Sequence, residues 1–334
     1  MKKLDRRRFL QTAALAAAGT ALPSFVPPLR AQTKKLVDVT YLMPAPLTLP
    51  AFVPWVLAKQ RGYYEAQGLN VDFEIAKGGV DVAKQVGAGN ALVGGALGDT
   101  PIIARANGVP VKAVAVMGGG SLSNLVVHEA SGIKGPADLK GKTLTVLSYQ
   151  ETTYYVVMAI LATVGLTKND VNIVAAGPAG GWQLFAAGKA DATAGPPEWA
   201  VYAEQAGAKT KIYRANNWVK SMAQAILASD DAIEKHPDMV KKLVDGTLKG
   251  LADIMKGPKA VVADFVAASP NFKGKEAMIE TVLDRYIEYV YSGQKKLGMI
   301  DPDRVAAMQK IYGEQGIVTK SVPLAELYTN RFVS

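Results

Sequence analysis

The chain has 334 residues and a formal net charge of +9, from 38 lysines and arginines against 29 aspartates and glutamates. It contains no cysteine, which excludes disulfides, thiol catalysis and cysteine metal sites. Hydrophobic residues make up 49% of the chain, and the length is sufficient for two lobes, each with its own core.

The first 31 residues have the layout of a secretory signal peptide, in which a basic stretch precedes an apolar run at residues 13–26. The adjacent Arg6 and Arg7, followed by Phe9 and Leu10, resemble the twin-arginine motif that directs folded proteins to the Tat export machinery. An uncleaved anchor is the alternative, but a membrane-spanning helix needs about 20 apolar residues. Glycine and proline interrupt this segment earlier. We therefore expect cleavage after Ala31.

Removal of the signal peptide changes the charge balance. Residues 1–31 contain six basic residues and one acidic residue, so the formal charge falls from +9 to +4. No dense cluster of lysine and arginine remains in the mature chain. The sequence therefore gives little support for binding to nucleic acid.

From Lys35 onward, short β-rich runs alternate with helical ones. Strands are predicted at residues 36–41, 70–75, 91–97, 111–117, 124–128, 142–147, 171–175 and 191–194. Helices are predicted at residues 52–59, from 78, from 101, at 152–164 and at 182–187, and almost throughout 230–313. This rhythm predicts an α/β architecture in which helices flank mixed, mostly parallel sheets.

Polar and aromatic residues gather where predicted strands lead into helices, at residues 44–50, 78–79, 98–100, 148–153 and 195–199. Open parallel sheets bind ligands beyond the carboxyl ends of their strands, where helix amino termini present unpaired N–H groups. A purely structural role is the alternative. Ser148 and Glu151 have the spacing of a capping box, and Asp99 with Thr100 can cap the next helix.

The tryptophans, too, can be either binding residues or structural ones. Trp182, Trp199 and Trp218 are candidates for the wall of a pocket, but tryptophan in an α/β protein lies as often in the core.

Catalytic constellations are mostly missing from the sequence. The two histidines, His128 and His236, have no neighbour at metal-ligand spacing, and there is no HExxH motif. The run Gly118 to Ser121 lacks the GxSxG pattern of hydrolases. Because a strand follows it, the run fits a mobile crossover better than a phosphate loop. We expect no catalytic residue, no metal and no cofactor.

The mature chain resembles a known family in several segments. It is similar, from about Lys35 to the carboxyl end, to the periplasmic substrate-binding proteins of ABC importers for nitrate, sulfonates and taurine, and to their thiamine-pyrimidine relatives. The segments that carry the resemblance lie at residues 61–65, 68–69, 71–73, 98–101, 135–142, 188–192, 195–199, 225–229 and 236–240.

The resemblance implies a two-lobed periplasmic-binding-protein fold of type II, with two hinge crossings near residues 120–124 and 217–224. One lobe would comprise residues 35–125 plus 225–334, and the other residues 130–214. The ligand would lie between the lobes and be delivered to an ABC transporter permease, by a protein that we expect to be a periplasmic monomer. Carried over position by position, the ligand-binding residues would be Thr48, Asp99, Thr100, Glu151, Thr152, Thr153, Glu198 and Trp199.

Three of these residues are acidic, and no arginine or lysine stands at the same corners. Carboxylates repel a bare anion such as nitrate. Within the ligand classes of the family, which include sulfonates, amino-sulfonates, aromatic acids and pyrimidines, we therefore expect a zwitterion, an amine-bearing heterocycle or an aromatic molecule.

Two other functions stay open at this stage. One is an enzyme like the pyrimidine synthases of the same fold, which use a cysteine-rich segment that this chain lacks. The other is an exported sensor that presents its ligand to a membrane receptor.

Overall fold

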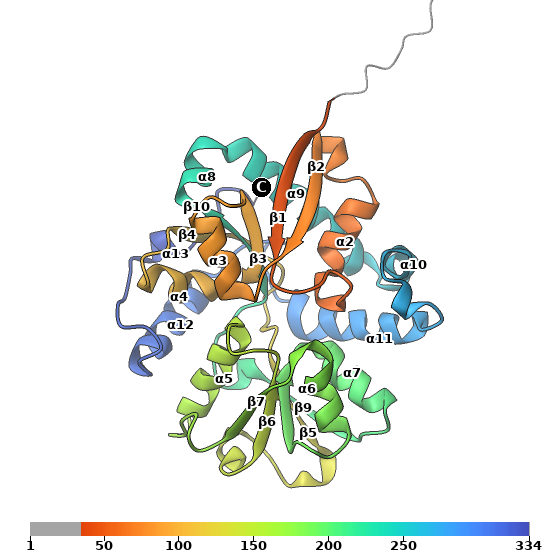
Figure 1. Ribbon diagram of the computed structural model, residues 1–334, viewed down its shortest axis with the longest axis vertical. Helices are drawn as coiled ribbons and strands as arrows, with labels where there is room; N and C mark the ends of the chain where they lie inside the picture. Colours follow the sequence, from red (N-terminus) through yellow and green to blue (C-terminus); the bar gives the residue numbers. More distant parts are fainter. Residues whose placement is uncertain (1–34, 334) are drawn as a thin grey trace, which may run out of the picture. The chain divides into compact units, whose positions relative to one another are not determined.

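The computed structural model describes residues 35–333, and the predicted signal peptide lies outside the described residues. The folded unit runs from Leu36 onward. It contains two five-stranded sheets with helices packed on them, which confirms the predicted α/β class (Figure 1).

The first sheet has the strand order β2-β1-β3-β10-β4. Strands β1 and β2 are parallel, as are β1 and β3, whereas β10 is antiparallel to both of its neighbours. The strands are β1 (Val37–Met43), β2 (Leu69–Ile75), β3 (Val93–Leu97), β4 (Val111–Val116) and β10 (Gln224–Ser229).

The second sheet repeats this arrangement in the order β7-β6-β8-β5-β9. Strand β6 is parallel to β7 and β8, and β5 is antiparallel to both of its neighbours. The strands are β5 (Asn124–His128), β6 (Thr143–Val146), β7 (Asn172–Ala175), β8 (Ala192–Gly195) and β9 (Thr210–Arg214).

The chain passes between the sheets twice, from β4 to β5 and from β9 to β10. The strand that follows each passage, β5 or β10, is the antiparallel strand of the sheet that it enters. Since β5 begins at Asn124, residues 124 and 125 pair within the second sheet. Gln224 pairs with Leu97 in the first sheet.

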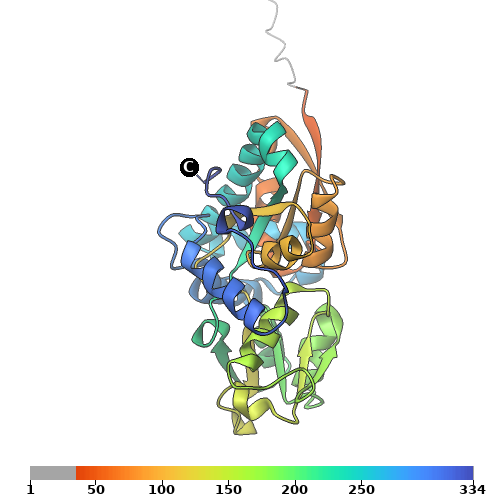
Figure 2. The same cartoon turned by 90° about the vertical axis from the view of Figure 1, so that its left-hand side faces the viewer.

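We use "first lobe" and "second lobe" for each sheet together with its helices (Figures 1 and 2). Helices α5 (Thr152–Ala162), α6 (Gly177–Ala186) and α7 (Pro197–Gln205) belong to the second lobe. The first lobe holds α2 (Val53–Gln60), α3 (Gly79–Gly87), α4 (Thr100–Ala106), α8 (Asp230–Lys235), α9 (Pro237–Lys256), α10 (Lys259–Ala268), α11 (Glu276–Tyr286), α12 (Pro302–Glu314) and α13 (Leu324–Leu327).

The lobes share part of a hydrophobic core. Val156, Ala159 and Ile160 of α5 are buried in the same cluster as the first sheet and its helices. The opposite side of α5, with Val157 and Leu161, packs against the second sheet. Helix α5 is hydrophobic on most of its surface because both of its faces are covered.

The glycine run at residues 118–120 lies in the crossing between β4 and β5 and is packed closely against other backbone. A Cβ on Gly118 would overlap the carbonyl oxygen of Val290, and one on Gly120 would overlap that of Tyr289. Ser121 and Ser221, one from each crossing segment, are joined by a hydrogen bond between their hydroxyls. Glycine is needed at residues 118 and 120 because the backbone of residues 289–290 approaches these positions closely.

Within residues 35–333, none of the helices combines the length and the apolar character that crossing a membrane requires.

Helix packing in the first lobe also depends on a glycine. A Cβ on Gly250 of α9 would overlap the carbonyl oxygen of Pro54 in α2. We expect Gly250→Ala to lower the free energy of unfolding by about 1–3 kcal/mol, because the helices must move apart. Gly313→Ala in α12 is the matched control, with no neighbouring atom within 4 Å of the added Cβ; it should gain about 0.5–1 kcal/mol from helix propensity. Urea unfolding of both variants measures this, and equal shifts would contradict the packing argument.

Candidate functional site

A buried pocket lies between the lobes, at the edge where parallel strands of both sheets end. Residues that follow β1, β6 and β8 line it, together with the last two residues of β3 and the first residue of β10. This is the position at which open α/β sheets bind ligands. The lining residues are Pro44, Ala45, Leu49, Ala51, Phe52, Ala96, Leu97, Leu122, Leu147, Glu151, Thr153, Pro178, Gly195, Pro196, Glu198, Trp199 and Gln224.

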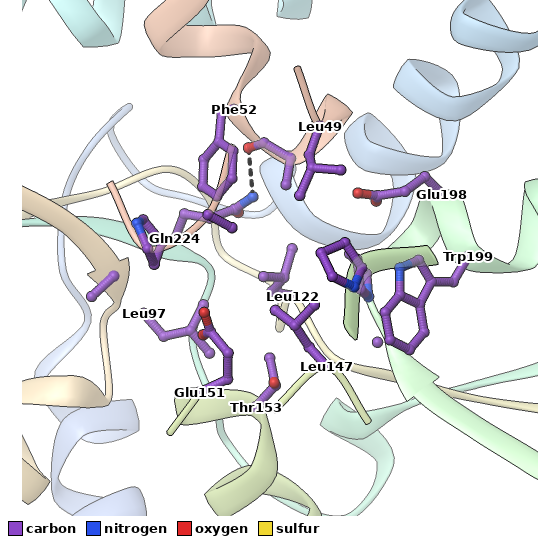
Figure 3. A pocket seen from close by; sticks show the side chains of 17 residues that line it. Leu49, Phe52, Leu97, Leu122, Leu147, Glu151, Thr153, Glu198, Trp199 and Gln224 are labelled. Atoms are coloured by element: carbon purple, nitrogen blue, oxygen red, sulfur yellow. Dashed lines mark hydrogen bonds between the residues drawn. The ribbon is translucent and has the colours of Figure 1, made fainter. Parts of the chain in front are cut away.

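Most of the wall is apolar, and the cavity has a volume of about 60 Å³. One water molecule needs roughly 10–15 Å³ by this measure, so the cavity has room for a small group only. Phe52 and Trp199 supply the aromatic part of the wall (Figure 3). Among the described residues that line the cavity, none is basic.

Two glycines leave room for the indole ring of Trp199. A Cβ on Gly181 of α6 or on Gly195 at the end of β8 would overlap the indole of Trp199. The ring therefore lies between these two positions, 3% exposed. A side chain larger than hydrogen at either glycine would displace the indole from the pocket wall.

Glu151 reaches across the space between the lobes. It stands at the start of α5 in the second lobe and accepts hydrogen bonds from the backbone N–H groups of Gly79, at the start of α3, and Thr152. Burial raises its pKa to about 7, and the two N–H donors oppose this rise. The predicted capping box does not form, because the Ser148 hydroxyl accepts from the N–H of Gln150 instead.

Glu198 makes a similar connection from α7. Its carboxylate accepts a hydrogen bond of 2.6 Å from the hydroxyl of Tyr286 in α11, and another from the N–H of Ala51. Both partners belong to the first lobe. Burial raises the pKa of Glu198 to about 7, against the effect of these donors.

Two polar atoms of the pocket have no hydrogen-bond partner among residues 35–333: Thr153 Oγ1 and Gln224 Oε1. Both residues are buried and line the cavity. The amide nitrogen of Gln224 donates to the carbonyl oxygen of Ala51 at 2.8 Å, which leaves the amide oxygen as an acceptor (Figure 3). A buried acceptor without a partner is costly, so this oxygen marks a position for a ligand donor.

The eight residues predicted from the sequence divide into two groups. Glu151, Thr153, Glu198 and Trp199 line the pocket, whereas Thr48, Asp99, Thr100 and Thr152 are not among the lining residues. Thr48 is exposed. Thr100 and Thr152 are buried and share a hydrogen bond of 2.7 Å between α4 and α5.

Asp99 is fully buried and serves the second crossing segment. Its carboxylate accepts from the N–H of Met222 at 3.0 Å, and its side chain does not cap α4. Burial raises the pKa of Asp99 to about 7, and the nearby guanidinium of Arg304 opposes this rise. Arg304 itself donates to the carbonyl oxygen of Ser221. Asp99 and Arg304 thus fix the backbone at residues 221–222.

Sequence reasoning missed Gln224, which it placed in a crossing segment. It also missed Leu49, Phe52, Leu122 and Leu147, because an apolar residue at a strand end has no chemical signal of its own. The run at residues 224–229, one glutamine followed by small and apolar residues, indicates a buried strand that begins with a polar side chain, and this was the available signal for Gln224. Of the other tryptophans, Trp218 packs beside Tyr213, and Trp182 lines a neighbouring cavity.

In the described part of the chain, the histidines and acidic groups form no metal site. His128 stacks on Phe185, with its Nε2 3.0 Å from the Phe185 carbonyl oxygen. His236 is exposed at the start of α9. Residues 35–333 hold no group of three histidine, cysteine or acidic side chains placed to bind a metal ion.

Comparisons with known proteins agree with this geometry. The sequence profile of the NMT1/THI5-like family matches residues 49–261. The riboflavin-binding protein RibY of Chloroflexus aurantiacus is 22% identical, over 84% of this chain and 82% of its own length. The 4-amino-5-hydroxymethyl-2-methylpyrimidine phosphate synthase of Schizosaccharomyces pombe is 23% identical, over 70% of this chain and 69% of its own.

A solved structure shows the same fold. The alkanesulfonate-binding protein SsuA of Xanthomonas axonopodis pv. citri, bound to MOPS, aligns with a TM-score of 0.69 at 18% identity. The alignment covers 87% of this chain and 98% of the other. The two-lobed architecture is therefore that of the periplasmic binding proteins, as the sequence predicted.

The buried carboxyl groups make stability depend on pH. Because the pKa of Glu198 is raised from 4.5 to about 7, the folded protein keeps this proton between those pH values while the unfolded chain releases it. Stability should therefore fall as pH rises from 4.5 to 7, by on the order of 3 kcal/mol for this group. Asp99 and Glu151 act in the same direction.

We expect Glu198→Gln to make the decline of unfolding free energy between pH 5 and 7.5 distinctly shallower, since glutamine has nearly the same shape, keeps an acceptor oxygen for Tyr286 and does not ionise. Denaturant titrations at several pH values measure the slope. Glu129→Gln, at an exposed residue outside the pocket, controls for the loss of one carboxylate. An unchanged slope in Glu198→Gln would show that Glu198 is not the titrating group.

Proposed function

The chain belongs to the NMT1/THI5-like family, and on this premise we propose that it is the solute-binding component of an ABC importer. The observation that carries the proposal is the buried pocket between two lobes, with two unpartnered polar atoms in its wall. After export through the Tat pathway and removal of residues 1–31, the monomer captures a small organic solute in the periplasm. It then delivers the solute to a permease in the inner membrane.

The pocket favours a solute that donates hydrogen bonds. Gln224 Oε1 and the carboxylates of Glu151 and Glu198 are acceptors, whereas the Thr153 hydroxyl can donate or accept. Flat apolar atoms of a ring fit against Phe52 and Trp199, where aromatic contacts contribute beyond the area that they bury. An amine-bearing heterocycle, such as an aminopyrimidine, combines these properties.

A sulfonate or another bare anion fits the pocket poorly. Helix amino termini attract anions, but here the Glu151 carboxylate itself accepts from the starts of α3 and α5. No basic side chain among the described lining residues would neutralise an anion. Glu151 and Glu198, whose pKa values are raised to about 7, would add repulsion where they are ionised. SsuA of Xanthomonas axonopodis pv. citri, in contrast, was solved with the sulfonate MOPS bound.

Movement of the lobes accompanies capture. We place the first lobe at residues 35–116 plus 224–333 and the second at 124–214, with hinges in the two crossings at 117–123 and 215–223, because Asn124 pairs in the second sheet and Gln224 in the first. Closure brings Glu151 to Gly79 and Glu198 to Tyr286, which are the contacts between the lobes that surround the pocket. Small-angle scattering of the processed protein should show contraction when solute is added.

A pyrimidine-synthase-like enzyme is the second candidate, favoured by the 23% identity to the enzyme of Schizosaccharomyces pombe. The chain has no cysteine, and neither histidine lines the pocket. Binding without reaction therefore accounts better for these residues. Recovery of an unaltered solute after prolonged incubation, followed by mass spectrometry, supports binding, and a changed mass supports catalysis.

The role of Gln224 provides a direct test. We expect 4-amino-5-hydroxymethyl-2-methylpyrimidine to raise the melting temperature, and Gln224→Ala to weaken its binding by about 10-fold or more, since a lost hydrogen bond in a buried site costs about 1–3 kcal/mol. Calorimetric titration measures both proteins. Gln183→Ala, exposed on α6 and outside the pocket, is the matched control. Tight binding of nitrate or an alkanesulfonate would contradict the proposed ligand class.

A further inference from the structure

A second and much larger cavity adjoins the buried pocket. This outer groove has a volume of about 1040 Å³ and lies between α6 and α7 of the second lobe and residues 271–281 of the first. Leu49 and Pro178 line both the pocket and the groove. The two cavities therefore lie next to each other, on either side of these two residues.

On α6 and on α7, residues four positions apart line first the pocket and then the groove. On α7, Glu198 lines the pocket and Tyr202, four residues later, lines the groove. On α6, Pro178 lines both cavities and Trp182, again four residues later, lines the groove. Residues four apart lie on the same side of a helix, so each helix presents a continuous surface from the pocket to the groove.

Aromatic rings form the inner part of the groove. Trp182 meets Tyr202 edge to face with ring centroids 5.5 Å apart, and Tyr202 stacks on Phe272 at 6.3 Å. The hydroxyl of Tyr202 is buried and has no hydrogen-bond partner among residues 35–333. These rings offer an apolar surface for a planar group, and the hydroxyl offers one polar contact at the same place.

The volumes of the pocket and of the groove limit the size of the solute. The pocket, at about 60 Å³, has room for a small group only in this arrangement of the lobes, whereas the groove has more than ten times this volume. Small-molecule sites commonly measure roughly 300–1,000 Å³. A solute that fills the whole site must therefore extend into the groove.

We propose that the solute has two parts: a hydrogen-bond-donating ring held in the pocket, and an aromatic or apolar arm that lies in the groove against Trp182 and Tyr202. This inference rests on the proposed function and names the shape of its solute. The ring determines which head group is recognised, and the arm adds affinity through buried apolar contact. Leu49 and Pro178, which line both cavities, lie where the two parts of the solute join.

Two probes that share a head group test the arm. They are 4-amino-5-hydroxymethyl-2-methylpyrimidine and its benzyl ether at the hydroxymethyl oxygen. By calorimetric titration of the unmodified protein, we expect the benzyl ether to bind at least 10-fold more tightly. Ala277→Trp places an indole in the groove from an exposed position of α11. This variant should abolish the advantage of the benzyl ether and change the affinity of the parent pyrimidine by less than 2-fold.

The controls separate this inference from the proposed function. Ala263→Trp, exposed on α10 and outside the groove, should keep the 10-fold advantage. Gln224→Ala should weaken both probes equally, because both use the pocket. If the parent pyrimidine binds through Gln224 but the arm adds nothing, or if Ala277→Trp leaves the advantage intact, only the two-part solute is wrong. If neither probe binds the unmodified protein, both proposals are contradicted.

Discussion

The Glu151 carboxylate lies between two helix amino termini that belong to different lobes. It accepts hydrogen bonds from the N–H groups of Gly79 and Thr152, the first of which comes from the opposite lobe. Such a carboxylate stabilises both helix starts through their partial positive charges. The neighbouring hydrogen bond between Thr100 and Thr152 joins a third helix start to the same place. These contacts bring the lobes together and so define the pocket that opens beside them.

Other groups place the rest of the site relative to this junction. Asp99 and Arg304 hold the second crossing segment through Met222 and Ser221. Gln224 follows two residues later and pairs with Leu97 at the end of β3. Its amide is directed by the bond to the carbonyl oxygen of Ala51. The unpartnered oxygen of Gln224 thus has a fixed position because the crossing segment, the first sheet and the loop after β1 all contribute to it.

Much of the fold was predictable because the signals for strands and helices lie in short runs of the sequence. Alternating or β-rich runs such as residues 70–75 can be recognised as strands from a short window of sequence, and the order of strands and helices restricts the architecture to a few α/β types. The candidate site was only half predictable. Glu151 and Glu198 stand out as acids at strand-to-helix corners, whereas Asp99 has the same appearance and turns toward Met222 instead. Side-chain direction at such corners depends on tertiary contacts that a single sequence does not display.

In the function proposed above, closure of the lobes and capture of the solute are linked through the unpartnered atoms of the pocket. In the closed arrangement Gln224 Oε1 and Thr153 Oγ1 are buried without a partner, and each such group costs about 1–3 kcal/mol. When the lobes separate, water can solvate both atoms, so this cost applies to the closed state. A solute that donates to Gln224 and meets Thr153 removes the cost only when the lobes are closed. A ligand shifts a conformational equilibrium by its difference in affinity between the two states, and these two atoms provide such a difference. An apolar molecule of the same size would fill the pocket but leave both atoms unpaired, and would therefore close the lobes less completely.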